Sequence, residues 1–450
     1  MKRYEVYDSF LDIWMDEIPA HWETHKMKYL FHERSEKGYP DEPLLVASQN
    51  MGVVPKNVYG NRTVEAQKDL HLLKLVRVGD FVISLRSFQG GLEYAYYQGI
   101  ISPAYTVLTP YEPITAGYFR YLAKSKLFIG LLTLCVTGIR EGQNIDYEKL
   151  RNHFLPVPPR AEQDQIVRYL DWQVSKINRL IAAKRKQIAV LLEQQKHRIV
   201  DAVLRGIDDN SVLKDSGEEW IGAIPKHWNV VRCKYVFTER DERSIAGEEE
   251  HLSMSQKFGL VPDSNLDERR MLSESYAGGK ICYKDDLVLN RLKAHLGVFA
   301  LAPQKGVISP DYTVLVSNTE RILPAYGEAV LKSDICRREL RIRVRGIIEG
   351  FWRLYTDDFN TIVIPLPPLE EQKRIMEYLS NLNEKYAALK QNLEQEITTL
   401  QELRIRMISD VVTGQVDVRG IEIPEFEYTA DADPSEDEPT EDMEPEPEEA

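Results

Sequence analysis

Residues 18–22 read Ile-Pro-Ala-His-Trp, and residues 224–228 read Ile-Pro-Lys-His-Trp. The pattern Lys-Tyr-x-Phe-x-Glu-Arg follows each copy, at residues 28–34 and 234–240. Four further matches keep the same order at offsets of 207 to 209 residues: 48–55 with 255–262, 101–108 with 308–315, 138–142 with 346–350, and 156–163 with 365–372. Six collinear matches indicate a duplication, and a period near 207 residues is too long for a solenoid. The sequence therefore predicts two similar globular units in tandem.

Each copy follows one plan, in which a mixed strand-and-loop domain of about 150 residues precedes a long helix. The strand candidates are β-branched and aromatic runs bounded by Gly, Pro and Asn, at residues 80–84, 105–108, 286–290 and 312–315. Proline-rich segments at 155–159 and 364–368 end the two domains, since proline suits a boundary and the first turn of a helix. The predicted fold class is α+β.

Apolar residues at alternating steps of three and four predict two helices with heptad seams. The first seam is Leu170, Val174, Ile177, Ile181, Ile188 and Leu191, with Lys184 in one slot. The second is Ile375, Leu379, Leu382, Tyr386, Leu389 and Leu393, followed by a phase shift toward Ile397 and Leu400. Because each seam needs cover, we expect the helices to pair as an antiparallel coiled coil of about 60 Å; two unrelated surface helices are the alternative. Gly206 and Gly414 sit where helix C-caps are expected.

The net charge of −14 is confined to the C-terminus. Residues 421–450 hold 14 acidic and no Lys or Arg side chains, whereas residues 1–420 hold 57 of each sign. The acidic segment also contains five prolines, so it is predicted to be a disordered tail. The neutral body has to be interpreted separately from the tail.

Several classes of protein are disfavoured by what the sequence lacks. No run of about 18 apolar residues suggests a membrane span, and the N-terminus does not resemble a secretory signal. The four scattered cysteines suggest neither zinc nor disulfides, so we expect a cytoplasmic protein without a metal site. Dinucleotide, P-loop and adenine-methyltransferase motifs are missing, and the repeated His21 and His227 are more typical of packing than of catalysis. The chain is therefore predicted to bind rather than to catalyse.

Local basic and amide residues are the candidates for binding DNA, because Arg and Lys neutralise phosphates or read guanine while Asn and Gln read adenine. Five arginines fall within residues 337–345, and basic residues follow two predicted strands at 84–86 and 290–293. The predicted DNA-binding residues are Gln49, Arg62, Arg86, Arg140, Gln143, Asn144, Gln256, Lys257, Arg291, Lys293, Arg341, Arg343 and Arg345. For any one of them, a solvated surface side chain is the alternative.

The duplicated I-P-x-H-W opening, the I-S-P-x-Y-T-V-L strand and the P-x-P-P-x-x-E-Q helix start resemble the specificity subunit of type I restriction-modification systems over about residues 10–420. The resemblance implies target recognition domains at 1–158 and 208–367 and spacer helices at 159–207 and 368–420, related by a pseudo-twofold axis, with residues 421–450 outside the pattern. Each domain would read one half of a bipartite, asymmetric DNA site, and the helices would set the spacing. The acidic segment 421–450 would then be either a solvating tail or a mimic of DNA that covers the recognition face of the free chain.

The same resemblance implies the partners. Two modification subunits would bring S-adenosylmethionine and methylate adenine, so this chain would hold no cofactor; an ATP-dependent restriction subunit is left open. The predicted partner-docking residues are Trp22, Trp228, Glu162, Gln163, Glu371 and Gln372. Two rival functions are a self-contained DNA methyltransferase or nuclease and a scaffold that binds only protein through its coiled coil.

Overall fold

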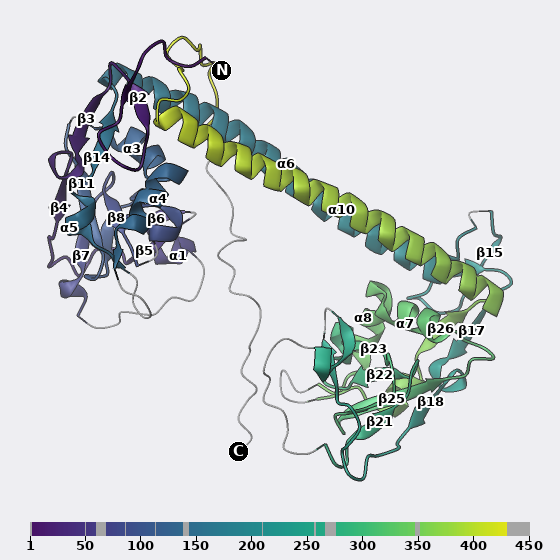
Figure 1. The fold of residues 1–450 in the computed structure, drawn as a ribbon. Helices are drawn as coiled ribbons and strands as arrows, with labels where there is room; N and C mark the ends of the chain where they lie inside the picture. The colour runs from purple at the N-terminus through teal and green to yellow at the C-terminus, as the bar shows by residue number, and fades with distance from the viewer. Residues whose placement is uncertain are drawn as a thin grey trace. The chain divides into compact units, whose positions relative to one another are not determined.

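The computed structural model describes residues 2–49, 51–59, 69–85, 87–112, 114–137, 144–208, 210–255, 258–265, 276–346 and 352–429. The chain divides into two compact units, which are treated separately below. The first unit comprises residues 1–186 and 393–450, and the second comprises residues 187–392 (Figure 1). Each unit therefore takes one end of each long helix.

The first unit is built on a four-stranded antiparallel sheet of order β4-β11-β8-β9. Val107 of β11 pairs with Arg34 of β4 on one side and with Val82 of β8 on the other. Val82 and Val107 are fully buried. The strands are β1 (Tyr7–Ser9), β2 (Glu17–Pro19), β3 (Glu23–Lys26), β4 (Phe31–Arg34), β5 (Leu45–Ser48), β6 (Gly52–Pro55), β7 (Lys74–Val76), β8 (Phe81–Ile83), β9 (Glu93–Tyr94), β10 (Gly99–Ile101), β11 (Thr106–Pro110), β12 (Val136–Thr137), β13 (Asn144–Ile145) and β14 (Phe154–Val157). The helices are α1 (Lys56–Tyr59), α2 (Ser87–Gly90), α3 (Ala116–Leu122), α4 (Lys126–Leu134), α5 (Tyr147–Leu150) and α6 (Arg160–Arg205), the last of which continues into the second unit.

The second unit contains a sheet of the same order, β18-β25-β22-β23. Val314 of β25 lies between Arg240 of β18 and Val288 of β22, at the register of Val107 in the first unit. The strands are β15 (Leu213–Asp215), β16 (Ala223–Pro225), β17 (Asn229–Arg232), β18 (Phe237–Arg240), β19 (Leu252–Ser255), β20 (Gly259–Pro262), β21 (Lys280–Cys282), β22 (Leu287–Asn290), β23 (Phe299–Leu301), β24 (Gly306–Ile308), β25 (Tyr312–Ser317) and β26 (Val363–Leu366). The helices are α7 (Pro324–Lys332), α8 (Asp334–Arg343), α9 (Thr356–Asn360) and α10 (Leu369–Val412), which ends in the first unit. All four predicted strands are confirmed, as β8, β11, β22 and β25.

The two proline-rich segments form strands at the ends of their domains. β14 pairs with β3, and β26 pairs with β17, so each segment closes its own domain by backbone hydrogen bonds. The helices begin directly after Pro159 and Pro368. They end at Arg205 and Val412, and the glycines just beyond, Gly206 and Gly414, have φ of +81° and +76°. The predicted C-terminal caps are confirmed, because this left-handed conformation strains any residue with a Cβ.

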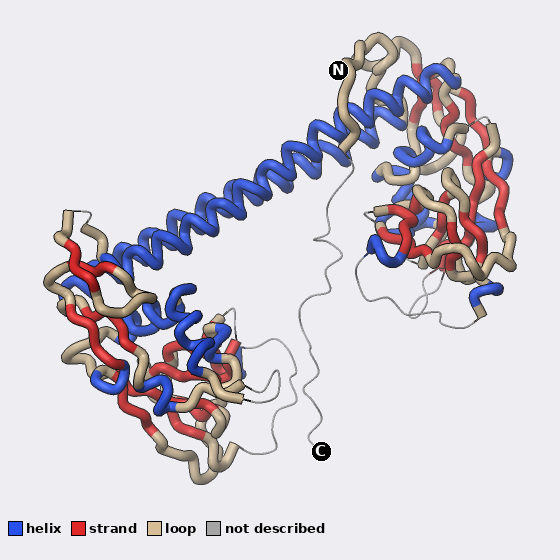
Figure 2. The backbone as a smooth tube through the Cα atoms, turned by 180° about the vertical axis from the view of Figure 1, so that it is seen from behind, coloured by secondary structure: helices blue, strands red, loops and turns tan. Residues whose placement is uncertain are grey.

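Figure 2 shows the two long helices side by side, and the order of their contacts is antiparallel: Asn178 and then Lys184 of α6 contact Arg404 and then Glu396 of α10. In the first unit Arg404 donates to Asn178 Oδ1 at 2.9 Å. In the second, Gln195 donates to Asn383 Oδ1 at 2.8 Å. Most of the predicted seam is buried or half-buried, but Leu389 is 41% exposed, so its assignment to the seam is wrong. The seam passes instead through the half-buried Lys390, which restores the phase toward Ile397.

The C-terminal segment does not match the prediction of disorder from Ile421 onward. Residues 421–429 lie along α6, where Gln165 Nε2 donates to the carbonyl of Ile421 (2.8 Å) and Ser175 Oγ accepts from the backbone N–H of Thr429 (3.0 Å). The prediction failed because α6 side chains bind the segment through its backbone, which composition does not reveal. The remainder of the predicted tail, 430–450, lies outside the described residues.

Candidate nucleic-acid interface

In both units a buried strand of the central sheet ends in a turn that packs against a helix. In the first unit β8 leads into α2, which lies against α4. In the second unit β22 leads into the turn 291–296, where Leu296 accepts a hydrogen bond from Arg337 of α8 (3.4 Å). We call these two regions the strand–turn–helix surfaces: residues 81–85 and 87–90 with 124–134, and residues 287–298 with 334–343. The predicted residues Lys293 and Arg341 lie on the second of them.

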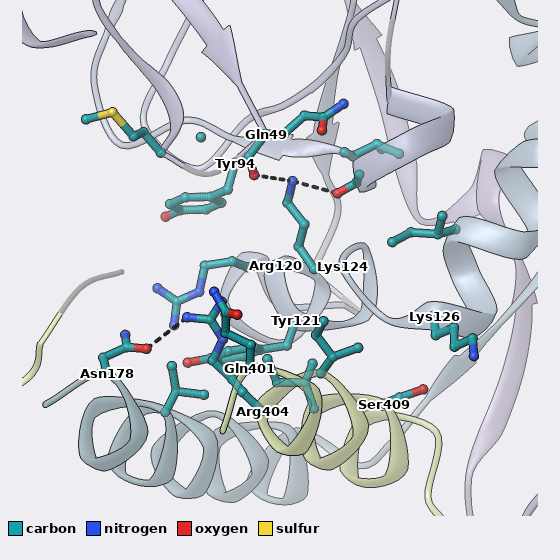
Figure 3. A pocket seen from close by; sticks show the side chains of 18 of the residues that line it. Gln49, Tyr94, Arg120, Tyr121, Lys124, Lys126, Asn178, Gln401, Arg404 and Ser409 are labelled. Carbon is teal, nitrogen blue, oxygen red and sulfur yellow. Dashed lines mark hydrogen bonds between the residues drawn. The ribbon is translucent and has the colours of Figure 1, made fainter. Parts of the chain in front are cut away.

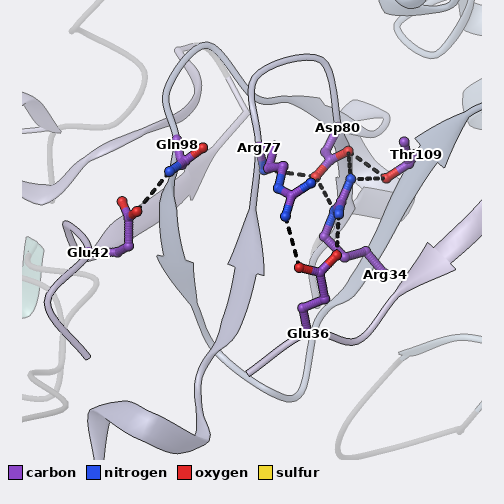
Figure 4. A network of polar contacts seen from close by, with 7 residues as sticks. All are labelled: Arg34, Glu36, Glu42, Arg77, Asp80, Gln98 and Thr109. Atoms are coloured by element: carbon purple, nitrogen blue, oxygen red, sulfur yellow. Dashed lines mark hydrogen bonds and ion pairs between the residues drawn. The ribbon is translucent and has the colours of Figure 1, made fainter. Parts of the chain in front are cut away.

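A buried aspartate fixes the start of β8 in the first unit. Asp80 is 1% exposed and accepts hydrogen bonds from Arg34 Nε (2.9 Å), Thr109 Oγ1 (2.6 Å) and the backbone N–H of Arg77 (2.8 Å; Figure 4). Its carboxylate therefore ties together β4, β11 and the turn before β8. Because a buried charge is tolerated only when it is paired and hydrogen-bonded, this network holds the strand in one position.

The second unit repeats the aspartate at the start of β22. Asp286 accepts from Arg240 Nε at 3.0 Å and from the backbone N–H of Tyr283 at 2.9 Å. The Arg240 side chain is 29% exposed, whereas that of Arg34 is 9% exposed. The second copy of the ion pair is thus more accessible to water than the first.

The turn after β8 is organised around a buried carboxyl group. Ser87 Oγ accepts from the backbone N–H of Ser84 (2.8 Å) and donates to Glu93 Oε2 (2.8 Å). Burial raises the pKa of Glu93 to about 7. The turn is therefore held by side-chain bonds that do not require solvent.

Lys124, two residues before the start of α4, holds two backbone segments together. Its Nζ donates to the carbonyls of Gln49 (3.0 Å) and Gly90 (2.8 Å; Figure 3). Burial lowers the pKa of Lys124, and Glu93 opposes that shift. The predicted reader Gln49 lies against α2, where a Cβ added to Gly90 would come within 2.9 Å of the Gln49 side chain. The structure thus brings Gln49 to the first strand–turn–helix surface.

Beside this surface, the first unit contains a cleft of about 1370 Å³ between its strand-rich part and the paired helices. Arg120 and Arg404 line it, together with the aromatic rings of Tyr94 and Tyr121 (Figure 3). Tyr96 lines it as well. Arg120 Nη2 lies 2.6 Å from Asp171 of α6. Guanidinium groups and aromatic faces are the side chains that suit phosphates and exposed bases.

In the second unit the turn after β22 separates two predicted readers. Arg291 is turned back onto the sheet, where its Nε donates to Thr313 Oγ1 at 2.8 Å and its Nη2 lies 3.6 Å from Glu239 Oε1. Lys293 is exposed, and its backbone N–H donates to Asn290 Oδ1 (3.3 Å). Direct reading by Arg291 would require it to leave these partners, whereas Lys293 is already at the surface.

The predicted arginine cluster is also divided. Arg343 pairs with Glu339, and Arg345 pairs with Asp358. Arg341 is exposed on α8 beside the turn 291–296, and burial together with the Arg341 charge lowers the pKa of His295. The second surface therefore presents Arg338 and Arg341 of the cluster, together with Lys293 of the turn, as exposed cations.

The remaining predicted DNA-binding residues are not part of either surface as described. Asn144 is exposed in β13, and its carbonyl accepts from Thr137 Oγ1 at 3.3 Å. Six of the predictions lie outside the described residues: Arg62, Arg86, Arg140, Gln143, Gln256 and Lys257.

The predicted partner-docking residues of the first unit lie inside it. Glu162 Oε1 accepts from Trp22 Nε1 (3.1 Å), and Glu162 Oε2 lies 2.7 Å from His21 Nε2. Gln163 donates to the carbonyl of Pro158 (2.9 Å) and accepts from the backbone N–H of Thr115 (2.8 Å). These side chains clamp the start of α6 to the domain.

The second unit repeats the clamp at the start of α10. His227 Nε2 lies 2.7 Å from Glu371 Oε2, and Gln372 accepts from the backbone N–H of Leu323 (2.8 Å). Trp228 is fully buried. All six predicted residues, three in each unit, are less than 9% exposed. A partner could therefore contact the helix starts that these side chains position, but not the side chains themselves.

Sequence reasoning missed the cations of the cleft. Arg404 is far from Arg120 and Lys124 in the sequence, so no local motif groups all three. One signal was present for Lys124: the dipeptide Lys-Ser occurs at 124–125 and again at 332–333. Both serines cap a helix, through hydrogen bonds from the backbone N–H of Phe128 and of Cys336 (3.3 Å each).

The described residues contain no group of three or more His, Cys, Asp or Glu arranged to hold a metal ion. All four cysteines are free and buried. Within the described ranges, no helix combines the length and the apolar character that a bilayer crossing requires.

Comparison with known proteins identifies the family. The model of the type I restriction modification DNA specificity domain matches residues 270–399. A protein of Methanocaldococcus jannaschii assigned as the MjaX specificity subunit of a type I restriction enzyme is 23% identical, over 92% of this chain and 97% of its own length. These matches support a type I specificity subunit. These subunits are non-catalytic proteins of DNA sequence recognition.

Two further matches agree with this assignment. The EcoKI specificity subunit of Escherichia coli is 22% identical, over 69% of this specificity subunit and 68% of its own length. A chain from a solved structure of a type I R-M system shares the fold, with a TM-score of 0.56 at 16% identity over 89% of this chain and 99% of that chain.

Proposed function

We propose that this specificity subunit reads a bipartite DNA site, each unit recognising one half. The observation that carries the proposal is the duplicated strand–turn–helix surface, built on sheets of the same strand order but bearing different side chains. The first surface presents Gln49 and Lys126, and the second presents Lys293 and Arg341. Equivalent scaffolds with different polar groups would recognise different base sequences, because side chains at base edges specify and the scaffold positions them.

The long helices would set the distance between the two half-sites. Their antiparallel contacts within each unit support the predicted coiled coil, and the clamps at Glu162 and Glu371 support rigid attachment of each domain to a helix start. The assigned domains (1–158 and 208–367) and spacers (159–207 and 368–420) belong to this proposal. Half-sites about one helical turn of DNA apart would place both domains on one face of the duplex.

Catalysis would come from two modification subunits, which dock on the pseudo-twofold scaffold and supply S-adenosylmethionine. They would flip the target adenine out of the duplex to methylate it. We infer a cytoplasmic location, where the chain meets chromosomal DNA; an ATP-dependent restriction subunit is compatible with the same scaffold. The helix starts held by the buried clamps are the surfaces that we assign to partner docking.

A reconstituted methyl-transfer assay tests this function. The purified chain is expected to shift duplex DNA and to transfer no methyl group alone, while addition of the methyltransferase encoded beside it gives methylation at one sequence. Methylation by the chain alone would establish the self-contained enzyme instead. Co-purification of the methyltransferase with no DNA shift by the chain or the complex would establish the protein scaffold.

A further inference from the structure

The cleft of the first unit carries more basic than acidic side chains. Its cations are Arg120, Lys124, Lys126, Arg404 and Arg406, and its acids are Glu402 and Asp410. Lys126 and Arg406 are exposed, and Arg406 Nε lies 3.5 Å from Asp410. The cleft lining therefore holds an excess of basic side chains, two of them exposed, which favours a polyanionic occupant.

The C-terminal segment reaches this cleft. Arg179 Nη2 donates to the carbonyl of Glu427 (3.0 Å), and Asn178 Nδ2 donates to the carbonyl of Thr429 (3.1 Å). Between them Tyr428 lines the cleft. Asn178 also accepts from Arg404, so one α6 side chain joins the segment to a cation of the cleft wall.

The sequence beyond Thr429 is complementary in charge. Residues 430–450 contain eleven Asp and Glu and no Lys or Arg. Since the chain is held at the edge of the cleft, this segment is present there at an effective concentration of about millimolar, as for a short tether. At roughly 3.3 Å per residue its length does not limit access to any part of the cleft.

We propose that residues 430–450 occupy the cleft of the first unit as an intramolecular polyanion and compete there with the phosphates of DNA. The described contacts of 421–429 provide the anchor, and Tyr428 provides the entry point. Occupancy of the cleft is independent of the proposed function, whereas the competition with DNA rests on it. The segment would suppress weak, sequence-independent binding, which is the electrostatic part of the affinity.

Zero-length carbodiimide crosslinking of the full chain tests occupancy without DNA. We expect crosslinks between the Lys126 amine and carboxylates of 430–450 at low salt and their loss at about 0.5 M salt, because the attraction is screened. Lys284, exposed in the second unit, is the matched control and should give no such crosslinks. Equal yields at Lys126 and Lys284, or none at Lys126, would overturn the proposal.

Duplex affinity then tests competition. A chain ending at Thr429 should bind non-specific duplex DNA roughly tenfold more tightly than the full chain at about 50 mM salt. A full-length chain in which all eleven acids of the tail are changed to Asn or Gln should show the same gain in affinity. Adding Lys126→Glu and Arg406→Glu should abolish the gain, whereas Lys284→Glu should not. Unchanged affinity after truncation refutes competition even if crosslinks form. Crosslinks in a chain that binds no DNA in any variant refute the proposed function and leave cleft occupancy supported.

Discussion

Asp80→Asn should destabilise the first unit more than Asp286→Asn destabilises the second. The substitution removes the charge of Asp80, whereas its partner Arg34, which is 9% exposed, stays buried and keeps only Glu36 as an ion partner. Removing one partner of a buried pair costs about 3–5 kcal/mol, and the remaining Glu36 pair puts the expected cost near the lower limit, at about 3 kcal/mol. Arg240 is 29% exposed, so water compensates it and the Asp286→Asn cost should be about 1 kcal/mol.

Native-state hydrogen exchange resolves the two units within one chain, which a single melting curve of a multidomain protein does not. The free energy of opening is measured for peptides covering β8 and β11, and for peptides covering β22 and β25. Asp80→Asn should lower it only in the first set, by about 2 kcal/mol more than Asp286→Asn lowers it in the second. Equal costs in the two units, or a loss in the second unit caused by Asp80→Asn, would refute the reasoning from burial.

Three further predictions concern pH, DNA contact and spacing. The folded-state pKa of Glu93 is about 7, against an ordinary value of 4.5, so the folded chain retains a proton that the unfolded chain releases, and the free energy of unfolding should fall by up to roughly 3 kcal/mol as pH rises between these values. The unfolding midpoint of Glu93→Gln relative to that of the wild type should therefore rise from pH 5 to pH 8, and a constant difference contradicts this. Lys293→Ala should weaken recognition of one half-site without loss of stability, and it should reduce the salt dependence of DNA binding by about one phosphate contact. Arg291→Ala should in addition destabilise β22. If both variants support methylation of the full site as the wild type does, neither residue reads DNA. Inserting one heptad into α6 between Lys184 and Gln195, and one into α10 between Asn383 and Glu396, lengthens the helix pair by about 10 Å. The gap between the half-sites should then grow by about three base pairs. Altered half-sites in the methylation pattern would contradict the spacer role.

The sequence predicted the parts of the fold that periodicity and duplication encode. The strands at 286–290 and 312–315 and the caps at Gly206 and Gly414 are at the predicted places, because β-branched runs and positive-φ glycines have local causes. Leu389 was misplaced because the seam changes phase, and hydrophobicity favours Leu389 over the half-buried Lys390.

The candidate site was less predictable, because its cations acquire their roles from tertiary partners. Nothing local distinguishes Arg291, which is held by Thr313, from Lys293, which is exposed two positions later. Likewise, Trp22 and Glu162 suggested a docking surface, but they bond to each other inside the unit. A polar or aromatic residue that recurs in both copies can belong to the shared scaffold as well as to a shared function.

A map of methylated adenines made with this specificity subunit and its methyltransferase tests the central claim most directly. We expect one asymmetric motif with two short defined halves, separated by a gap of fixed length and unspecified sequence. An uninterrupted motif, or the same methylation pattern when this chain is omitted, would contradict recognition of a bipartite site by its two units.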